Sequence, residues 1–79
     1  MNIYIFNVSS VVQSEDLKNM FAVYGDVQSA EIVRDIISGE SRGYGFIEMR
    51  DEKAAQTAIA ALDQTEIDSL FITVQENRN

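Results

Sequence analysis

Aromatic residues recur at every second position in two short stretches of this sequence. Residues 3–8 read Ile-Tyr-Ile-Phe-Asn-Val, and residues 42–49 read Arg-Gly-Tyr-Gly-Phe-Ile-Glu-Met. This alternation is typical of a β-strand, whose successive side chains point to opposite faces of its sheet. Tyr4 and Phe6 therefore share one face, as do Tyr44 and Phe46. Rings displayed on a rigid surface offer stacking sites for unpaired bases, each worth about 1–3 kcal/mol by alanine substitution.

Residues suited to catalysis or metal binding are scarce in the chain. It contains no histidine and no cysteine, so it has neither the commonest general base nor a thiol nucleophile, a thiolate zinc site or a disulfide. Its carboxylates show no metal-ligand spacing, and Ser9 and Ser10 have no evident activating partner. We therefore expect neither enzymatic activity nor a cofactor, a metal or a small-molecule substrate.

Six segments with strand or helix character position the aromatic residues. Strands are predicted over residues 3–8, 27–34, 43–49 and 70–75. Apolar residues at helical spacing predict a first helix over residues 14–24, with Ser14 as its N-cap and Gly25 in a left-handed C′ position. A stripe built mostly of alanine predicts a second helix after Asp51, its expected N-cap.

The order β-α-β-β-α-β predicts a ferredoxin-like α+β plait, a four-stranded antiparallel sheet with two helices on one face. The residues expected to face the helices are Ile3, Ile5, Ile32, Ile47, Met49, Ile72 and Val74. The residues expected on the open face are Tyr4, Phe6, Glu31, Val33, Arg42, Tyr44, Phe46, Glu48, Phe71, Thr73 and Gln75. Five of the seven aromatic residues thus gather on the open face, and a contiguous apolar patch usually marks an interaction site.

Two details of the strands are predicted from small residues. Ser29 and Ala30 are candidates for a β-bulge, which would shift the register of the second strand. Gly43 and Gly45 alternate with the aromatic residues of the third strand, so we expect both on the helix-covered side. There they would leave room for the second helix to approach the sheet.

Length and composition indicate one small globular domain, which we expect to span residues 1–79. A hydrophobic fraction of 46% is ordinary for such a domain. No apolar run approaches the ~20 residues needed to span a membrane, and no signal-peptide pattern opens the chain. We therefore expect no membrane association, and the absence of cysteine fits a reducing cytoplasm.

The stretch from Arg42 to Met49 resembles the eight-residue ribonucleoprotein motif of the RNA recognition motif family, and Ile3 to Val8 resembles its six-residue motif. The separation of the two motifs and the helices around them agree with the family, and the resemblance covers essentially the whole chain. The short chain is more similar to the small single-domain bacterial members than to multidomain eukaryotic ones. The resemblance implies binding of single-stranded RNA on the open sheet face, by aromatic stacking with a basic phosphate contact.

The resemblance also implies a role for each motif residue. By position, Tyr4 and Tyr44 match the two rings that stack on successive bases. Phe46 matches the ring that inserts between the sugars of those nucleotides. Arg42 matches the cation that bridges the phosphate between them.

Four further residues lie around these positions. Phe6 and Phe71 would extend the stacking platform, with partial burial by the chain ends as the alternative. Gln75, at the end of the last strand, matches positions that hydrogen-bond base edges. Asn7 is expected to shape the loop after the first strand rather than to read a base.

The charge balance opposes this function. Thirteen acidic residues against six basic ones give a formal net charge of -7, whereas phosphate binding normally rests on a basic surface. Glu31 and Glu48 are expected on the open face, although the family often has a basic or neutral residue at the first position. We therefore expect micromolar affinity, stacking that contributes more than charge, and a log–log salt slope of about −0.7 to −1.5.

A second class of function remains open, in which the aromatic face binds a protein or a second copy of the chain. The acidic balance favours this alternative, and the full set of stacking rings favours RNA. Single-stranded DNA is an alternative ligand, because no residue marks a contact to the 2′-hydroxyl. We expect a monomer.

Overall fold

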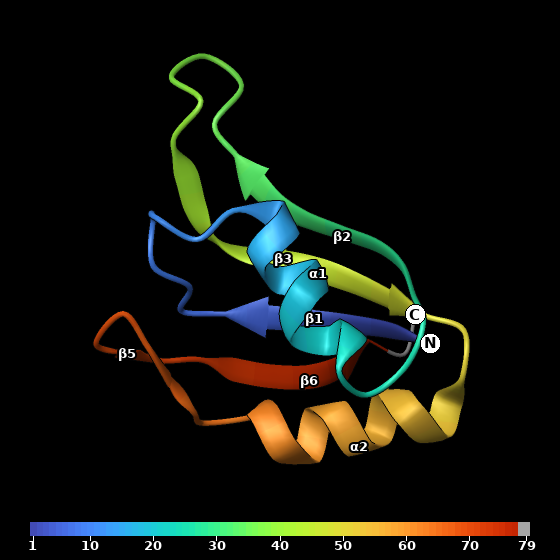
Figure 1. Ribbon diagram of the computed structural model, residues 1–79. Coiled ribbons are helices and arrows are strands. Elements are labelled where there is room, and N and C mark those ends of the chain that lie inside the picture. Colours follow the sequence, from blue (N-terminus) through green and yellow to red (C-terminus); the bar gives the residue numbers. More distant parts are fainter. Residues whose placement is uncertain (78–79) are drawn as a thin grey trace.

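Four strands and two helices form the two layers of the computed structural model, which describes residues 1–77. The elements are β1 (Asn2–Phe6), α1 (Ser14–Ala22), β2 (Val27–Arg34), β3 (Ser41–Met49), α2 (Glu52–Leu62), β4 (Glu66–Ile67), β5 (Leu70–Phe71) and β6 (Thr73–Asn77). The main sheet has the strand order β2-β3-β1-β6 with antiparallel neighbours, and both helices lie on one of its faces (Figure 1). The predicted ferredoxin-like plait is confirmed.

The core lies between the helices and the sheet. All seven strand residues expected to face the helices are buried, and six of them expose 2% or less of their surface. Leu17 and Phe21 of α1 and the alanines Ala55 and Ala58 of α2 close the core from the other side. Neither helix in the described part of the chain is long and apolar enough to cross a membrane.

The start of α1 differs from the prediction. The N-cap is Gln13, whose backbone N–H donates to the Asp16 carboxylate at 2.8 Å. The Ser14 hydroxyl instead accepts from the backbone N–H of Ile32 at 3.0 Å, which ties α1 to β2. Asp51 does cap α2 as expected, because its carboxylate accepts from the N–H groups of Lys53 and Ala54.

The end of α1 also corrects the prediction. The helix stops at Ala22, two residues before the predicted end, and Gly25 is not left-handed. A Cβ on Gly25 would lie 2.7 Å from the Cβ of Ala54, which is closer than Cβ atoms approach in proteins. Gly25 is therefore required because α2 packs against it and not because of its backbone conformation.

The glycines of β3 likewise have reasons other than helix packing. A Cβ on Gly45 would lie 2.4 Å from the carbonyl oxygen of Glu31, so the close neighbour is β2 and not α2. Gly43 has a φ of +82°, a region that favours glycine, and its carbonyl accepts from the N–H of Val8 at 2.8 Å. The interpretation that both glycines make room for the second helix is wrong.

Strand β2 carries the irregularity that its small residues predicted. The register shifts between Val27 and Ser29, and again between Ile32 and Arg34. The first shift leaves Gln28 as the extra residue, one position before the predicted bulge. Because of this shift, Val27 and Ile32 are both buried although they are an odd number of residues apart.

The predicted last strand, residues 70–75, is divided between two sheets. Leu70 and Phe71 form β5, which pairs with β4 in a small hairpin, and the main sheet continues only from Thr73. The turn residues Asp68 and Ser69 have φ values of +52° and +69°, as a two-residue hairpin turn requires. The prediction missed this hairpin because its turn residues, Asp68 and Ser69, include no glycine.

Candidate nucleic-acid interface

Four aromatic rings from β1 and β3 form a contiguous group on the open face, here called the ring cluster. Tyr4 lies opposite Phe46 in the β1–β3 register, and Phe6 lies opposite Tyr44. The ring centroids are 4.9 Å apart in the first pair and 6.3 Å apart in the second. Along the strands, the centroids are 5.6 Å apart for Tyr4 and Phe6, and 6.2 Å apart for Tyr44 and Phe46. The four rings thus occupy the corners of one small quadrilateral.

The ring cluster lies on the face opposite the helices. The residues that alternate with the rings, Ile3, Ile5, Gly45 and Ile47, are all buried in the core. Phe46 remains 38% exposed, and the other three rings are half-buried against one another. The predicted orientation of all four rings is confirmed, and the rings, tilted by 29° to 83° to one another, form one contiguous apolar surface that solvent can reach.

Two polar side chains flank the ring cluster in one line across all four strands, here called the central row. The cross-strand partners in this row are Glu31 of β2, Phe46 of β3, Tyr4 of β1 and Gln75 of β6. Glu31 and Gln75 are exposed. Neighbouring strands are about 4.8 Å apart, so a base lying on either ring reaches the polar side chain beside it. The structure brings Gln75 next to Tyr4, as a base-edge contact needs.

Phe71 is separated from the ring cluster. It lies on β5, outside the main sheet, with 58% of its surface exposed, and it makes no ring contact with another described residue. Its carbonyl accepts a hydrogen bond from the Asn7 side chain at 3.0 Å. Asn7 itself has a φ of +61° and ends β1, so the expectation that it shapes the loop is confirmed.

A second hydrogen bond holds the β4–β5 hairpin near the end of β1. The hydroxyl of buried Ser9 donates to the Asp68 carboxylate at 2.5 Å. Ser9 therefore has a partner that sequence analysis did not find. Asp68 lies in the turn of the β4–β5 hairpin. Its hydrogen bond to Ser9 therefore helps to hold the hairpin, and with it Phe71, in position.

Arg42 lies near the start of β3, two residues before Tyr44, and is paired with an acid. Its Nη2 atom is 2.9 Å from Oδ2 of Asp35, and the Arg42 side chain is 55% exposed. The other carboxylate oxygen of Asp35 accepts from the backbone N–H groups of Ile37 and Ser38, each at 2.9 Å. The hydrogen bonds from Ser38 and Ile37 hold the pKa of Asp35 below its usual value.

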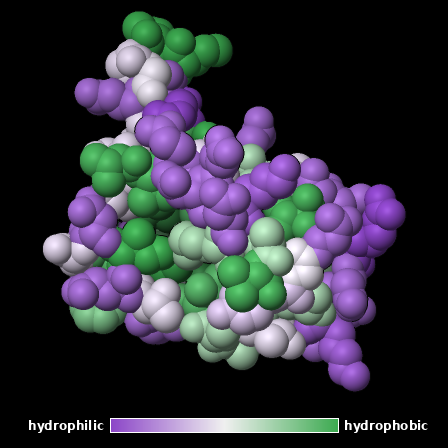
Figure 2. Space-filling view, viewed as in Figure 1, coloured by the Kyte–Doolittle hydropathy of each residue, from purple (hydrophilic) through white to green (hydrophobic). Residues whose placement is uncertain are grey.

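The loop built on Asp35 presents an apolar tip that sequence analysis did not identify. Ile36 and Ile37 are 98% and 93% exposed, and the apolar group at the top of Figure 2 lies over this β2–β3 loop. Gly39, with a φ of +76°, closes the turn by donating its N–H to the Asp35 carbonyl. The sequence feature that could have predicted this tip is the pair of adjacent isoleucines between Asp35 and Ser38-Gly39. These flanking residues are typical of a turn, where apolar side chains stay exposed.

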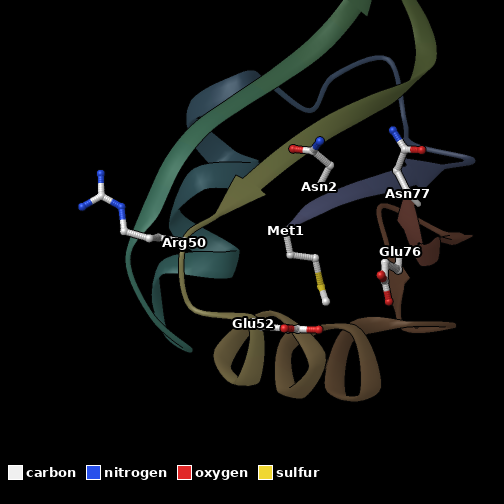
Figure 3. Close-up of a pocket in the computed structure, with 6 residues that line it drawn as sticks. All are labelled: Met1, Asn2, Arg50, Glu52, Glu76 and Asn77. Carbon is white, nitrogen blue, oxygen red and sulfur yellow. The ribbon is translucent and has the colours of Figure 1, made fainter. Parts of the chain in front are cut away.

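A shallow pocket of about 360 Å³ lies at the other end of the sheet (Figure 3). Its lining residues are Met1, Asn2, Arg50, Glu52, Glu76 and Asn77. The Arg50 side chain extends away from the other five in Figure 3, and the pocket contains no aromatic ring. The pocket therefore offers no aromatic ring on which a base could stack, and no member of the ring cluster lines it.

Comparisons with known proteins agree with this architecture. The family model described as RNA recognition motif matches residues 3–73. Glycine-rich RNA-binding protein 8 of Arabidopsis thaliana is 38% identical over 73 residues, which cover 92% of this chain and 43% of that protein. RbpE, a candidate RNA-binding protein of Nostoc sp. (strain PCC 7120), is 41% identical over 66 residues, which cover 84% of this chain and 67% of that protein.

Solved structures show the same fold. The crystal structure of RNA-binding protein PG1 has a TM-score of 0.96 and 40% identity, covering 100% of this chain and 95% of that one. The Rna15 domain with bound RNA has a TM-score of 0.88 at 24% identity, covering 99% and 83%. This chain spans less than half the length of the plant protein that it matches. Because the family match includes both ring-bearing strands and nearly all of the described core, this chain belongs to the RNA recognition motif family, an RNA-binding family.

Proposed function

We propose that this protein binds single-stranded RNA on the open face of its sheet, by base stacking on the ring cluster and a phosphate contact from Arg42. The observation that carries the proposal is the group of four adjacent rings on a solvent-facing sheet. Two relatives and one similar structure are named as RNA-binding proteins, which supports the same ligand. Since the chain spans only part of its plant relative, the proposal concerns this domain.

The geometry supports a different division of roles among the rings from the one that motif position implied. Tyr4 and Phe46 are cross-strand partners in the middle of the sheet, and Phe46 is the most exposed of the four rings. Tyr44 is the ring nearest in sequence to Arg42, two residues away on the same strand. We therefore assign base stacking to Tyr4 and Phe46, and contact with the sugar–phosphate backbone to Tyr44.

The remaining predicted residues have supporting roles in this proposal. Gln75 lies beside Tyr4 and has both a donor and an acceptor for the edge of the base stacked there. Phe6 packs against Tyr4 and Tyr44 and keeps those rings in position. Phe71, on the hairpin beyond the end of β1, offers a separate exposed ring for a further nucleotide.

The test is an amide-shift NMR titration of the labelled protein with short random-sequence RNA at low salt. We expect shifts clustered on β1 and β3, and we expect them to vanish in a folded Tyr44→Ala, Phe46→Ala double variant. Of the two single variants, Phe46→Ala should lose more affinity, since one base stack is worth about 1–3 kcal/mol. A larger loss for Tyr44→Ala would restore the role assignment implied by motif position. No shifts at high RNA concentration would refute RNA binding.

A protein-binding or self-associating role is the second candidate, and the net charge of -7 favours it. The exposed rings could bury against a basic or apolar partner as well as against bases. Sedimentation that depends on protein concentration, and that loses this dependence in Phe46→Ala, would support self-association. Under the RNA proposal we expect a cytoplasmic monomer that sediments independently of its concentration.

A further inference from the structure

Glu31 occupies a position in the central row where a phosphate-binding surface should not have a carboxylate. It is the cross-strand partner of Phe46 and it is exposed. Its backbone belongs to the sheet, but among the described residues none forms a hydrogen bond or ion pair with its carboxylate. Its charge repels phosphate, and nothing in the described fold requires it there. A function in ligand recognition would explain a carboxylate without a partner beside Phe46, the most exposed ring of the ring cluster.

The chemistry of a carboxylate restricts which base it can recognise. An ionised carboxylate only accepts hydrogen bonds, and its two oxygens can accept a parallel pair. Guanine presents two adjacent donors on its Watson–Crick edge, N1–H and the N2 amino group. Adenine and cytosine present one amino group beside a ring acceptor that the carboxylate repels, and uracil presents one N–H between two carbonyl oxygens.

We propose that Glu31 selects guanine at the position where a base stacks on Phe46. The inference rests on the proposed function, because the carboxylate reads a base edge only if the ring beneath holds the base. A base lying on Phe46 extends over the adjacent strand β2, about 4.8 Å away, where Glu31 lies. The acid thus gives sequence preference at the cost of general affinity for phosphate.

The other residues of the open face do not offer the same selection. Gln75, at the opposite end of the central row, has an amide that both donates and accepts, so it can adapt to several bases. Glu48 is also exposed, but its cross-strand partners are Asn2 and Ser29, and none of these three residues carries a ring. Glu48 is therefore a matched control that carries the same charge on the same face, in a row without a stacking site.

The experiment measures Kd by fluorescence anisotropy for uridine hexamers that carry one guanosine, inosine or adenosine at a central position. Inosine lacks only the N2 amino group of guanosine. The variants are Glu31→Ala and Glu48→Ala, and alanine is used because a glutamine amide can itself pair with guanine. We expect the wild type to prefer guanosine over adenosine about tenfold, the lower part of the range for a bidentate base contact, with inosine between them.

In Glu31→Ala this preference should fall to about twofold or less, while Glu48→Ala should keep it. Both variants should bind the all-uridine hexamer somewhat more tightly than the wild type, because each loses one negative charge from the same face. A wild type without guanosine preference, or equal loss of preference in the two variants, would overturn the inference while binding of all hexamers persists. Failure of the wild type to bind any hexamer would instead refute the proposed function itself.

Discussion

At the scale of single residues, Arg42, the residue proposed to contact phosphate, already forms an ion pair with Asp35. Arg42 is 2.9 Å from Asp35, whose carboxylate would compete with an incoming phosphate for the guanidinium. Since backbone hydrogen bonds lower the pKa of Asp35, its carboxylate stays charged through the neutral range. The ion pair is lost only as the pH falls through that lowered pKa, so mild acid does not free Arg42.

The two oxygens of Asp35 have separate partners, and one substitution distinguishes them. Oδ1 accepts from Ile37 and Ser38, and Oδ2 pairs with Arg42. Asp35→Asn keeps an oxygen for the turn and removes the partner of Arg42. We expect it to tighten RNA binding about two- to fivefold, the scale on which exposed ion pairs act, measured by anisotropy with a uridine hexamer.

The matched control for Asp35→Asn is Glu40→Gln, which removes one negative charge from the same loop without changing the partner of Arg42. An equal gain in both variants would mean that net charge alone is responsible. Weaker binding by Asp35→Asn would mean that Asp35 orients Arg42 for the phosphate, so that the ion pair assists binding.

Gly45 is a residue whose replacement should affect stability directly. A Cβ at this position would meet the Glu31 carbonyl oxygen at 2.4 Å, and backbone atoms cannot move away cheaply. We expect Gly45→Ala to lower the free energy of unfolding by about 1–3 kcal/mol, as overpacking does, measured by urea denaturation. A loss below about 0.5 kcal/mol, the size of an ordinary surface substitution, would contradict this account of the glycine.

At the scale of elements, α2 is positioned by contacts between small residues. Its fully buried residues are the alanines Ala55 and Ala58. The Cβ of Ala54 would be 2.7 Å from any Cβ at Gly25. The helix can therefore approach the turn after α1 closely. This approach closes the core over Met49, whose side chain also borders Gly25.

The contact between Gly25 and Ala54 predicts coupling between two substitutions. Gly25→Ala should destabilise the protein by about 1–3 kcal/mol through overpacking, and Ala54→Gly by about 1 kcal/mol through helix propensity. The double variant should lose at least about 0.5 kcal/mol less than the sum, because each change relieves the other. Urea denaturation of the four proteins in a double-mutant cycle measures this coupling, and additive losses would exclude the contact.

At the scale of the whole molecule, the net charge of -7 restricts how the proposed ligand is bound. Most acids lie at helix ends and in connecting loops. On the open face, however, Glu31 and Glu48 oppose phosphate, and Arg42 is paired with Asp35. Stacking must therefore provide most of the affinity, and counterion release can provide only a small part.

This balance predicts a weak dependence of RNA affinity on salt. With one or two phosphate contacts, a plot of log K against log salt concentration should have a slope of about −0.7 to −1.5. Anisotropy titrations with one RNA across a series of salt concentrations measure this slope. A slope near −4 would mean that several more cations reach the phosphates than the open face of the sheet provides.

The sequence by itself determined the fold and the faces on which the predicted core residues and the four rings lie. Side chains return to the same face every 2 residues in a strand and every 3.6 residues in a helix. These two periods assign residues to faces whatever their distant neighbours are. The predicted core residues and the four-ring surface on β1 and β3 follow from this local rule. The bulge in β2 was predicted within one residue from a different local feature, the small residues Ser29 and Ala30.

Only the tertiary structure decided which residues from different strands are neighbours. Register between strands placed Glu31 beside Phe46 and Gln75 beside Tyr4, and no local period contains that information. Contacts between distant segments explain Gly25 and Gly45, and they accompany the separation of Phe71 from the ring cluster. The pairing of Arg42 with Asp35 is closer in sequence, but it depends on how the β2–β3 loop folds back. Periodicity acts along the chain, whereas packing and charge pairing act across it, so the second set depends on the folded arrangement.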